Sequence, residues 1–172
     1  EFEYDPEQLN CLFHPTVHEP VWDEEKLSDE GQKKAFTKDA RAVLEDVLAG
    51  KRAGRKAYIL LAPAFLGQYH DVTTGQIRNA FRKMGFDGLV EVALFADILT
   101  LKEALEFDRN IQSESDYMLT SCCCPMWVAM IKKSFRHLMP HVPPSVSPMI
   151  AAGRTVKKLY PDALTVFLGP CM

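Results

Sequence analysis

The sequence lacks any apolar run that approaches the roughly 20 residues needed by a membrane-spanning helix. It also lacks a strong charge of either sign, because 20 basic and 23 acidic residues leave a formal net charge of -3. Such a balance provides no basic surface for nucleic acid or for lipid headgroups, so we expect neither nucleic acid nor a membrane as a partner. The acidic start is not a signal peptide. Because no methionine begins the chain, we expect further residues upstream.

The cysteines lack the spacing of a disulfide framework and that of a structural zinc site. There are five, an odd number, and Cys122, Cys123 and Cys124 are adjacent. A zinc site would pair thiols two to four residues apart, twice. Neighbouring cysteines are badly placed to bond each other, which favours a reducing, cytoplasmic location. A nucleophilic cysteine would need a histidine, and His137 and His141 stand at the far end of the following helical segment. Five buried structural cysteines are the alternative.

Short apolar runs alternate with helical periodicity from about residue 36 onward. The runs typical of strands are 57–62, 89–94, 117–119 and 164–168. Between them apolar residues recur at helical spacing, with one helix expected to begin at Asp97 or Thr100. This order predicts an α/β fold with a parallel sheet of about four strands and flanking helices. Residues 1–35 contain three prolines and predict an irregular arm or linker, and residues 36–172 one α/β domain.

Thiols follow two of the predicted strands, at the edge where a parallel sheet binds its ligands. One strand leads into the three adjacent cysteines and another into Gly169-Pro170-Cys171, whereas the first ends in the small residues Ala62-Pro63-Ala64. This convergence favours a soft-metal or iron–sulfur site. A cubane cluster normally takes four thiolates, more than these positions supply. We therefore expect the remaining ligands to come from further polypeptide.

The residues around these thiols resemble motifs of the iron-only hydrogenases. Thr120 to Trp127 is similar to the first cluster motif of that family, commonly T-S-C-C-P-x-W, and Leu168 to Met172 to the start of the second, commonly M-P-C-x-x-K-x-x-E. Three shorter stretches resemble further parts of the family in the same order: Ala62-Pro63-Ala64, Phe95-Ala96-Asp97 with Glu103 and Glu106, and Ser147-Pro148. The resemblance runs from about residue 56 to the end.

The resemblance implies an incomplete H-cluster domain, the H-cluster being a cubane (4Fe–4S) joined to a two-iron unit. The implied reaction interconverts protons and electrons with dihydrogen, and the implied partners are a ferredoxin-like or other electron carrier and the remaining C-terminal part of the same protein. By the same resemblance Cys124 and Cys171 are metal ligands, and Cys123, Glu103 and Glu106 carry protons. The residues expected beside the cofactor are Ala62, Pro63, Ala64, Ser147 and Pro170.

A second alignment of the cysteine motif stays open. Alignment on Pro125-Met126-Trp127 makes Cys124 the ligand and leaves Cys122 as an extra residue. Alignment on Thr120-Ser121 makes Cys123 the ligand and Cys122 the proton carrier. We prefer the first, because the proline and tryptophan fix the following helix and so the direction of the thiolate. With this alignment, the resemblance to the hydrogenases requires the sulfur atoms of Cys124 and Cys171 to face each other across one cavity.

The chain also departs from the common pattern of the family. It has a third cysteine, Gly169 where methionine is common, Met149 where a polar residue is common, and Pro143 near the position of a relay serine. These changes resemble a sensory branch of the family, and the missing ligands predict that the fragment alone is inactive. Two alternatives are a related iron–sulfur protein that binds a cubane for electron transfer or assembly, and a metal-free interaction module.

Overall fold

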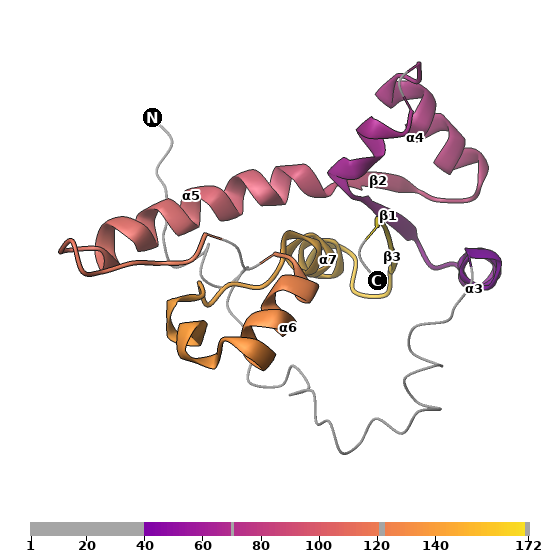
Figure 1. Cartoon of the computed structure of the whole chain (residues 1–172). Helices are drawn as coiled ribbons and strands as arrows, with labels where there is room; N and C mark the ends of the chain where they lie inside the picture. Colours follow the sequence, from indigo (N-terminus) through magenta and orange to yellow (C-terminus); the bar gives the residue numbers. More distant parts are fainter. Residues whose placement is uncertain (1–39, 70, 121–122, 171–172) are drawn as a thin grey trace, which may run out of the picture. The chain divides into compact units, whose positions relative to one another are not determined.

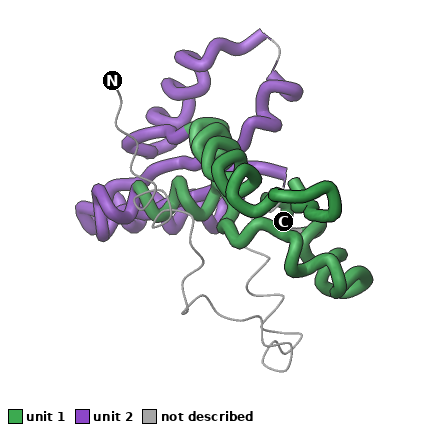
Figure 2. The backbone as a smooth tube through the Cα atoms, turned by 90° about the vertical axis from the view of Figure 1, so that its left-hand side faces the viewer, with its two compact units in different colours: residues 1–15, 91–155, 171 green, residues 16–90, 156–170, 172 purple. Residues whose placement is uncertain are grey.

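The computed structural model describes residues 40–69, 71–120 and 123–170 (Figure 1). The chain divides into two compact units (Figure 2). Among the described residues, unit 1 comprises 91–155, and unit 2 comprises those from 40 to 90 and from 156 to 170. The predicted arm, residues 1–35, lies outside the described residues. The same is true of its boundary with the predicted domain, so both stay predictions.

Unit 2 is built on a parallel sheet of three strands in the order β2-β1-β3. The central strand β1 (Ala57–Leu61) runs parallel to β3 (Leu164–Leu168), with Ala57 opposite Leu164 and Leu61 opposite Leu168. The other edge is β2 (Gly88–Glu91), whose last residue is assigned to unit 1. The side chains of β1 are buried almost throughout, as expected for the apolar central strand of a parallel sheet.

Helices and a small apolar core complete unit 2. Helix α3 (Ala40–Arg52) contacts β1 and β3, a short 3-10 helix η1 (Pro63–Gly67) follows β1, and α4 (Thr74–Lys83) leads toward β2. A reciprocal pair of hydrogen bonds between Thr73 and Gln76 caps the start of α4. The core brings these elements together through Val47, Ala57, Ile59 and Phe86, with Phe81, Leu89, Leu164 and Val166 packed against them.

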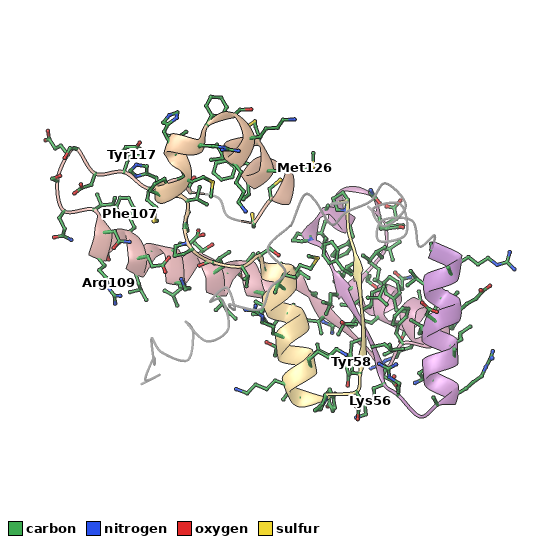
Figure 3. All side chains as sticks on the ribbon, turned by 90° about the horizontal axis from the view of Figure 1, so that it is seen from below. Lys56, Tyr58, Phe107, Arg109, Tyr117 and Met126 are labelled. Atoms are coloured by element: carbon green, nitrogen blue, oxygen red, sulfur yellow. The ribbon has the colours of Figure 1, made fainter. Side chains whose placement is uncertain are left out.

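Two tyrosines cover the start of β1. The rings of Tyr58 and Tyr160 stack with centroids 5.2 Å apart, and the Lys56 ammonium lies 4.1 Å from the centre of the Tyr160 ring. Figure 3 shows Lys56 and Tyr58 near each other at this end of the strand. Burial, followed by the hydrogen bond with Tyr160, raises the pKa of Tyr58 to about 12. The phenol therefore stays neutral well above the ordinary range for tyrosine.

The elements that begin in unit 1 are α5 (Val92–Asn110), α6 (Pro125–Ser134), a short 3-10 helix η2 (Arg136–His141) and α7 (Pro148–Leu159). Helix α6 contacts η2, and the last residues of α7 are assigned to unit 2. On α5 the buried residues are Val92, Phe95, Leu99 and Lys102. Their spacing of three or four residues places them on one face of the helix. This face ends in a lysine.

Two expectations about strands were wrong in detail. The described residues form three strands rather than about four, because 117–119 is not a strand. Instead of pairing with a strand, this segment contacts His141. The Leu119 N–H donates to the His141 carbonyl oxygen at 2.8 Å, and the rings of Tyr117 and His141 stack. The strand predicted over 89–94 ends at Glu91, and α5 begins at Val92 rather than at Asp97 or Thr100.

The reason for the second error is an ambiguity of short apolar runs. Val92, Ala93 and Leu94 continue the apolar composition of the strand, and a run of this length fits a buried strand and a buried helix equally well. Burial decides between the two, since Val92 and Phe95 share the inward face of α5. Over the described ranges, no helix is both long enough and apolar enough to cross a membrane.

Candidate functional site

Small residues meet where β1 and β3 end in unit 2. Ala62 follows β1 directly, is buried, and donates its backbone N–H to the carbonyl oxygen of Leu168 at 2.9 Å. A Cβ atom on Gly169 would lie 2.8 Å from the Cβ of Ala62 and 2.6 Å from Cζ of Phe167, closer than real Cβ atoms approach such neighbours. The two strand ends are therefore in contact at this edge, and the contact requires a glycine at position 169.

The other predicted residues of this edge are accessible. Pro63 starts η1, and Pro63, Ala64 and Pro170 are exposed. A proline at the first turn of a helix costs no hydrogen bond, because the N–H that it lacks would have no partner within the helix. The structure thus brings Ala62 and the Gly169-Pro170 turn together at the carboxyl edge of the sheet. Cys171 lies outside the described residues.

In unit 1, Cys124 is the N-cap residue of α6. Its backbone is extended, with φ −93° and ψ 110°, a proline follows in the first turn, and its side chain makes no capping hydrogen bond. Cys124 is half-buried, whereas Cys123 is exposed. The first turn of a helix leaves backbone N–H groups without partners within the helix. The predicted ligand position therefore lies beside free donor groups, and Cys122 lies outside the described residues.

Glu103 and Glu106, the predicted proton carriers on α5, are both half-buried. Glu106 forms an ion pair through Oε1 with the ammonium of Lys102. The same ammonium donates to Oγ of Ser145 at 2.9 Å, from the loop before α7. Ser147 follows two residues later, half-buried, and its carbonyl oxygen accepts from the N–H groups of Ile150 and Ala151 at the start of the helix.

Sequence reasoning missed Lys102, although a signal for it existed. The apolar residues Val92, Phe95 and Leu99 mark the buried face of α5, and the next position at that spacing is 102. A lysine there departs from the pattern, because a charged side chain on a buried helix face needs a partner of opposite charge. Glu106, one turn further along, is at the distance for such a partner.

The thiol at Cys124 is the kind of donor that iron in a cubane cluster uses. Of the residues predicted to hold the cluster, Cys124 is therefore the described one whose chemistry and position fit. The described residues contain no group of three or more histidine, cysteine, aspartate or glutamate side chains placed to hold a metal ion. Because Cys171 is not described, its sulfur and the distance to Cys124 stay predictions.

Unit 2 has small residues at the carboxyl edge of its parallel sheet, and unit 1 has a cysteine at a helix N-terminus. Taken separately, these features suit the class of α/β proteins that bind a cofactor through thiolates. Residues 55–172, more than half of the chain, match the family described as "Iron only hydrogenase large subunit, C-terminal domain". The chain belongs to this family. The resemblance predicted from about residue 56 onward is confirmed.

Three curated relatives are hydrogenases. The chain is 28% identical to "Iron hydrogenase 1" of Clostridium pasteurianum over 106 residues, which cover 57% of this chain and 18% of the relative. It is 28% identical over 122 residues to "Periplasmic [Fe] hydrogenase large subunit" of Nitratidesulfovibrio vulgaris, covering 65% and 29%. The third, at 26% over 99 residues, is "NADP-reducing hydrogenase subunit HndD" of Solidesulfovibrio fructosivorans, covering 54% and 17%. The chain spans less than a third of each.

Proposed function

We propose that the chain is part of the active-site domain of an iron-only hydrogenase, which interconverts protons and electrons with dihydrogen at an H-cluster. The observation that carries this proposal is the position of Cys124 in a chain that matches the family. Its thiol stands at the N-terminus of α6, directly before the proline of the first cluster motif. The relatives are named as hydrogenases, which supports the same class of oxidoreductase.

The proposed roles of the residues follow from their chemistry. Cys124 and Cys171 hold the cubane through their thiolates, because iron in such clusters takes thiolate ligands. Ala62, Pro63, Ala64, Ser147 and Pro170 surround the cofactor, and the small side chains among them allow backbone to approach a bulky inorganic group. The H-cluster supplies the electron transfer and hydrogen chemistry when it is bound.

The chain's own residues then handle protons. Cys123 is the proposed donor and acceptor beside the cluster, and its exposed thiol can exchange protons with its surroundings. Glu103 and Glu106 are one turn apart on α5 and are proposed to carry protons between solvent and the site. Pro143 is buried and has no hydroxyl to pass a proton, which supports slower proton delivery and a sensing role.

The proposed partners are an electron carrier, ferredoxin-like or of another kind, and the remaining C-terminal part of the same protein. The second follows from the number of thiolates, since a cubane takes four and this chain assigns two. The proposed location is the cytoplasm, because adjacent cysteines are badly placed to bond each other and suit a reducing compartment. One relative is named periplasmic, so finding the protein in the periplasm of its own cell would contradict the proposed location.

Serine substitutions of the adjacent cysteines test the proposal. In the full-length protein with its cluster assembled, Cys124→Ser should remove most of the cubane iron and abolish the infrared bands of iron-bound carbonyl and cyanide. Cys122→Ser is the matched control and should leave the iron content unchanged. The measurements are iron per protein, infrared spectra and hydrogen evolution. A cubane without carbonyl and cyanide bands in the unsubstituted protein would instead favour electron transfer or assembly.

The same series separates the two alignments of the motif. Loss of iron in Cys123→Ser, with iron retained in Cys124→Ser, would assign the ligand to Cys123 and the proton carrier to Cys122. Iron retained in every single cysteine variant, including Cys171→Ser, would contradict both alignments and favour the metal-free interaction module.

A further inference from the structure

Lys102 is the buried charged residue in the described part of the chain, with 6% of its side chain exposed. It continues the inward face of α5 after Leu99. A lysine in such a place is retained at a cost, because burial removes the hydration of its ammonium. The contacts that offset this cost indicate what the residue does.

Two acceptors hold the ammonium in place. Nζ forms an ion pair with Oε1 of Glu106, one helical turn away, and donates a hydrogen bond to Oγ of Ser145 at 2.9 Å. The Glu106 side chain is 20% exposed, so water screens this pair less than it would screen an ion pair on the surface. The lysine therefore forms a shielded ion pair within α5, and its hydrogen bond to Ser145 joins this helix to the loop before α7.

The ion pair with Lys102 involves only one oxygen of the Glu106 carboxylate and leaves the second oxygen, Oε2, for a proton. Oε2 is buried and has no hydrogen-bond partner among the described residues. To carry a proton, the carboxylate must bind it at one oxygen and later release it. A proton bound at Oε2 would neutralise Glu106 and leave the buried ammonium of Lys102 without its counter-charge. The ion pair thus opposes the protonation step that proton transfer through Glu106 requires.

We propose that Lys102 is a positioning residue that pairs with the Glu106 carboxylate and thereby restrains the passage of protons through it. This inference rests on the proposed function and adds a restraint to it. Lys102 touches neither substrate nor cofactor in the proposal, and it acts through Glu106. The restraint is set by a single side chain, so substituting that side chain should release it.

A purely structural role is the competing explanation. The same contacts could serve only to fasten α5 to Ser145, in which case removal of the ammonium would loosen unit 1 and slow every reaction of the site. The two explanations predict opposite effects on turnover. They also differ on whether the effect depends on the carboxylate of Glu106.

The test compares variants of the full-length protein with its cluster assembled. Lys102→Met removes the positive charge and keeps an unbranched apolar side chain. Lys102→Arg is the matched control, because it keeps the positive charge. We expect Lys102→Met to raise hydrogen evolution on the order of tenfold, less than the roughly 10²–10⁴-fold of a complete proton-transferring group because the restraint is partial, and Lys102→Arg to leave it close to wild type. The double variant Lys102→Met/Glu106→Gln should lose this gain.

Infrared difference spectra give a second readout, and its first part, the comparison of the wild type with Glu106→Gln, does not require any lysine variant to fold. Comparison of the wild type with Glu106→Gln during turnover should show no carbonyl band of a protonated carboxyl group. In Lys102→Met such a band should appear and should vanish again in the double variant. A Glu106 acid band in the wild type would overturn the proposal.

The remaining outcomes are also decisive. Unchanged or slower turnover in Lys102→Met, with the carbonyl and cyanide bands of the cluster intact, would overturn the restraint and favour the structural role. A gain that survives Glu106→Gln would overturn it too. Failure of the proposed function is a different result, namely a wild-type protein with no cluster bands and no turnover, and the restraint would then fall with it.

Discussion

Asp87 joins three segments of unit 2 through one side chain and its own backbone. Its Oδ1 accepts from the Lys51 ammonium at 2.5 Å, and its Oδ2 accepts from the backbone N–H of Ala57 at 2.7 Å. Its own N–H donates to the carbonyl oxygen of Ala57 at 2.7 Å. Burial acts to raise the pKa of Asp87, but the hydrogen bonds and the charge of Lys51 outweigh it and lower the pKa below 3.8.

The lowered pKa of Asp87 predicts how the stability of unit 2 depends on pH. A carboxyl group with a lowered folded-state pKa stabilises the fold above its ordinary value, and this contribution is lost as pH falls through the folded value. Asp87→Asn should therefore reduce the free energy of unfolding by about 1 kcal/mol near neutral pH. The difference from wild type should begin to shrink as pH falls through 3.8 and should disappear below the lower, folded-state pKa. Urea unfolding across this range measures it.

Asp71→Asn provides the control for Asp87, because Asp71 is an exposed aspartate in the same unit. It should leave the free energy of unfolding close to wild type at each pH. A constant loss from Asp87→Asn, with no pH dependence, would show that the side chain acts through its shape rather than through its charge.

At the scale of elements, the contact between the ends of β1 and β3 depends on Gly169. A Cβ atom there would overlap Ala62, whose own Cβ cannot rotate away. Gly169→Ala should therefore lower the free energy of unfolding by about 1–3 kcal/mol, the usual cost of overpacking. Gly67→Ala is the matched control, since a Cβ at position 67 would meet nothing within 4 Å.

Urea unfolding of the two glycine variants measures the difference. Equal stability of Gly169→Ala and Gly67→Ala would mean that the strand ends separate easily, and the close approach of Ala62 to Gly169 would then not be a constraint. Because this edge is where the cofactor is proposed to lie, the iron content of Gly169→Ala in the full-length protein is a useful second measurement.

The sequence predicted the starts of helices well where a single residue such as proline marks them. It predicted strands less well where the outcome depends on contacts with distant residues. The start of α6 at Pro125 and of α7 at Pro148 follow from prolines that suit a first helical turn. The segment 117–119 has an apolar composition typical of a strand, yet its partners are the carbonyl oxygen and the ring of His141. No short-range pattern indicates that contact, because it joins residues more than 20 positions apart.

At the scale of the whole molecule, the chain corresponds to a minor part of its relatives, between 17% and 29% of their lengths. The count of thiolates then predicts its behaviour in isolation. A cubane takes four, and Cys124 and Cys171 supply two of the proposed ligands. The 172 residues by themselves should therefore evolve no hydrogen after incubation with iron and sulfide.

A longer form of the protein that contains the remaining ligands is the positive control for this experiment. It should retain about one H-cluster per chain and evolve hydrogen from a chemical reductant. Hydrogen evolution by the 172-residue chain itself would contradict the prediction and would require that its other cysteines complete the ligand set.

The sequence by itself determined the family, the α/β class and the residues at the strand ends, because all of these depend on motifs and on periodicity within a few residues. Only the tertiary structure decided that position 169 must be glycine, that Asp87 joins α3 to the start of β1, and that Lys102 is buried against Glu106 and Ser145. Lys102 and Ser145 are 43 residues apart. Contacts between such distant residues depend on how the segments pack, and packing is a property of three-dimensional distance rather than of spacing along the chain.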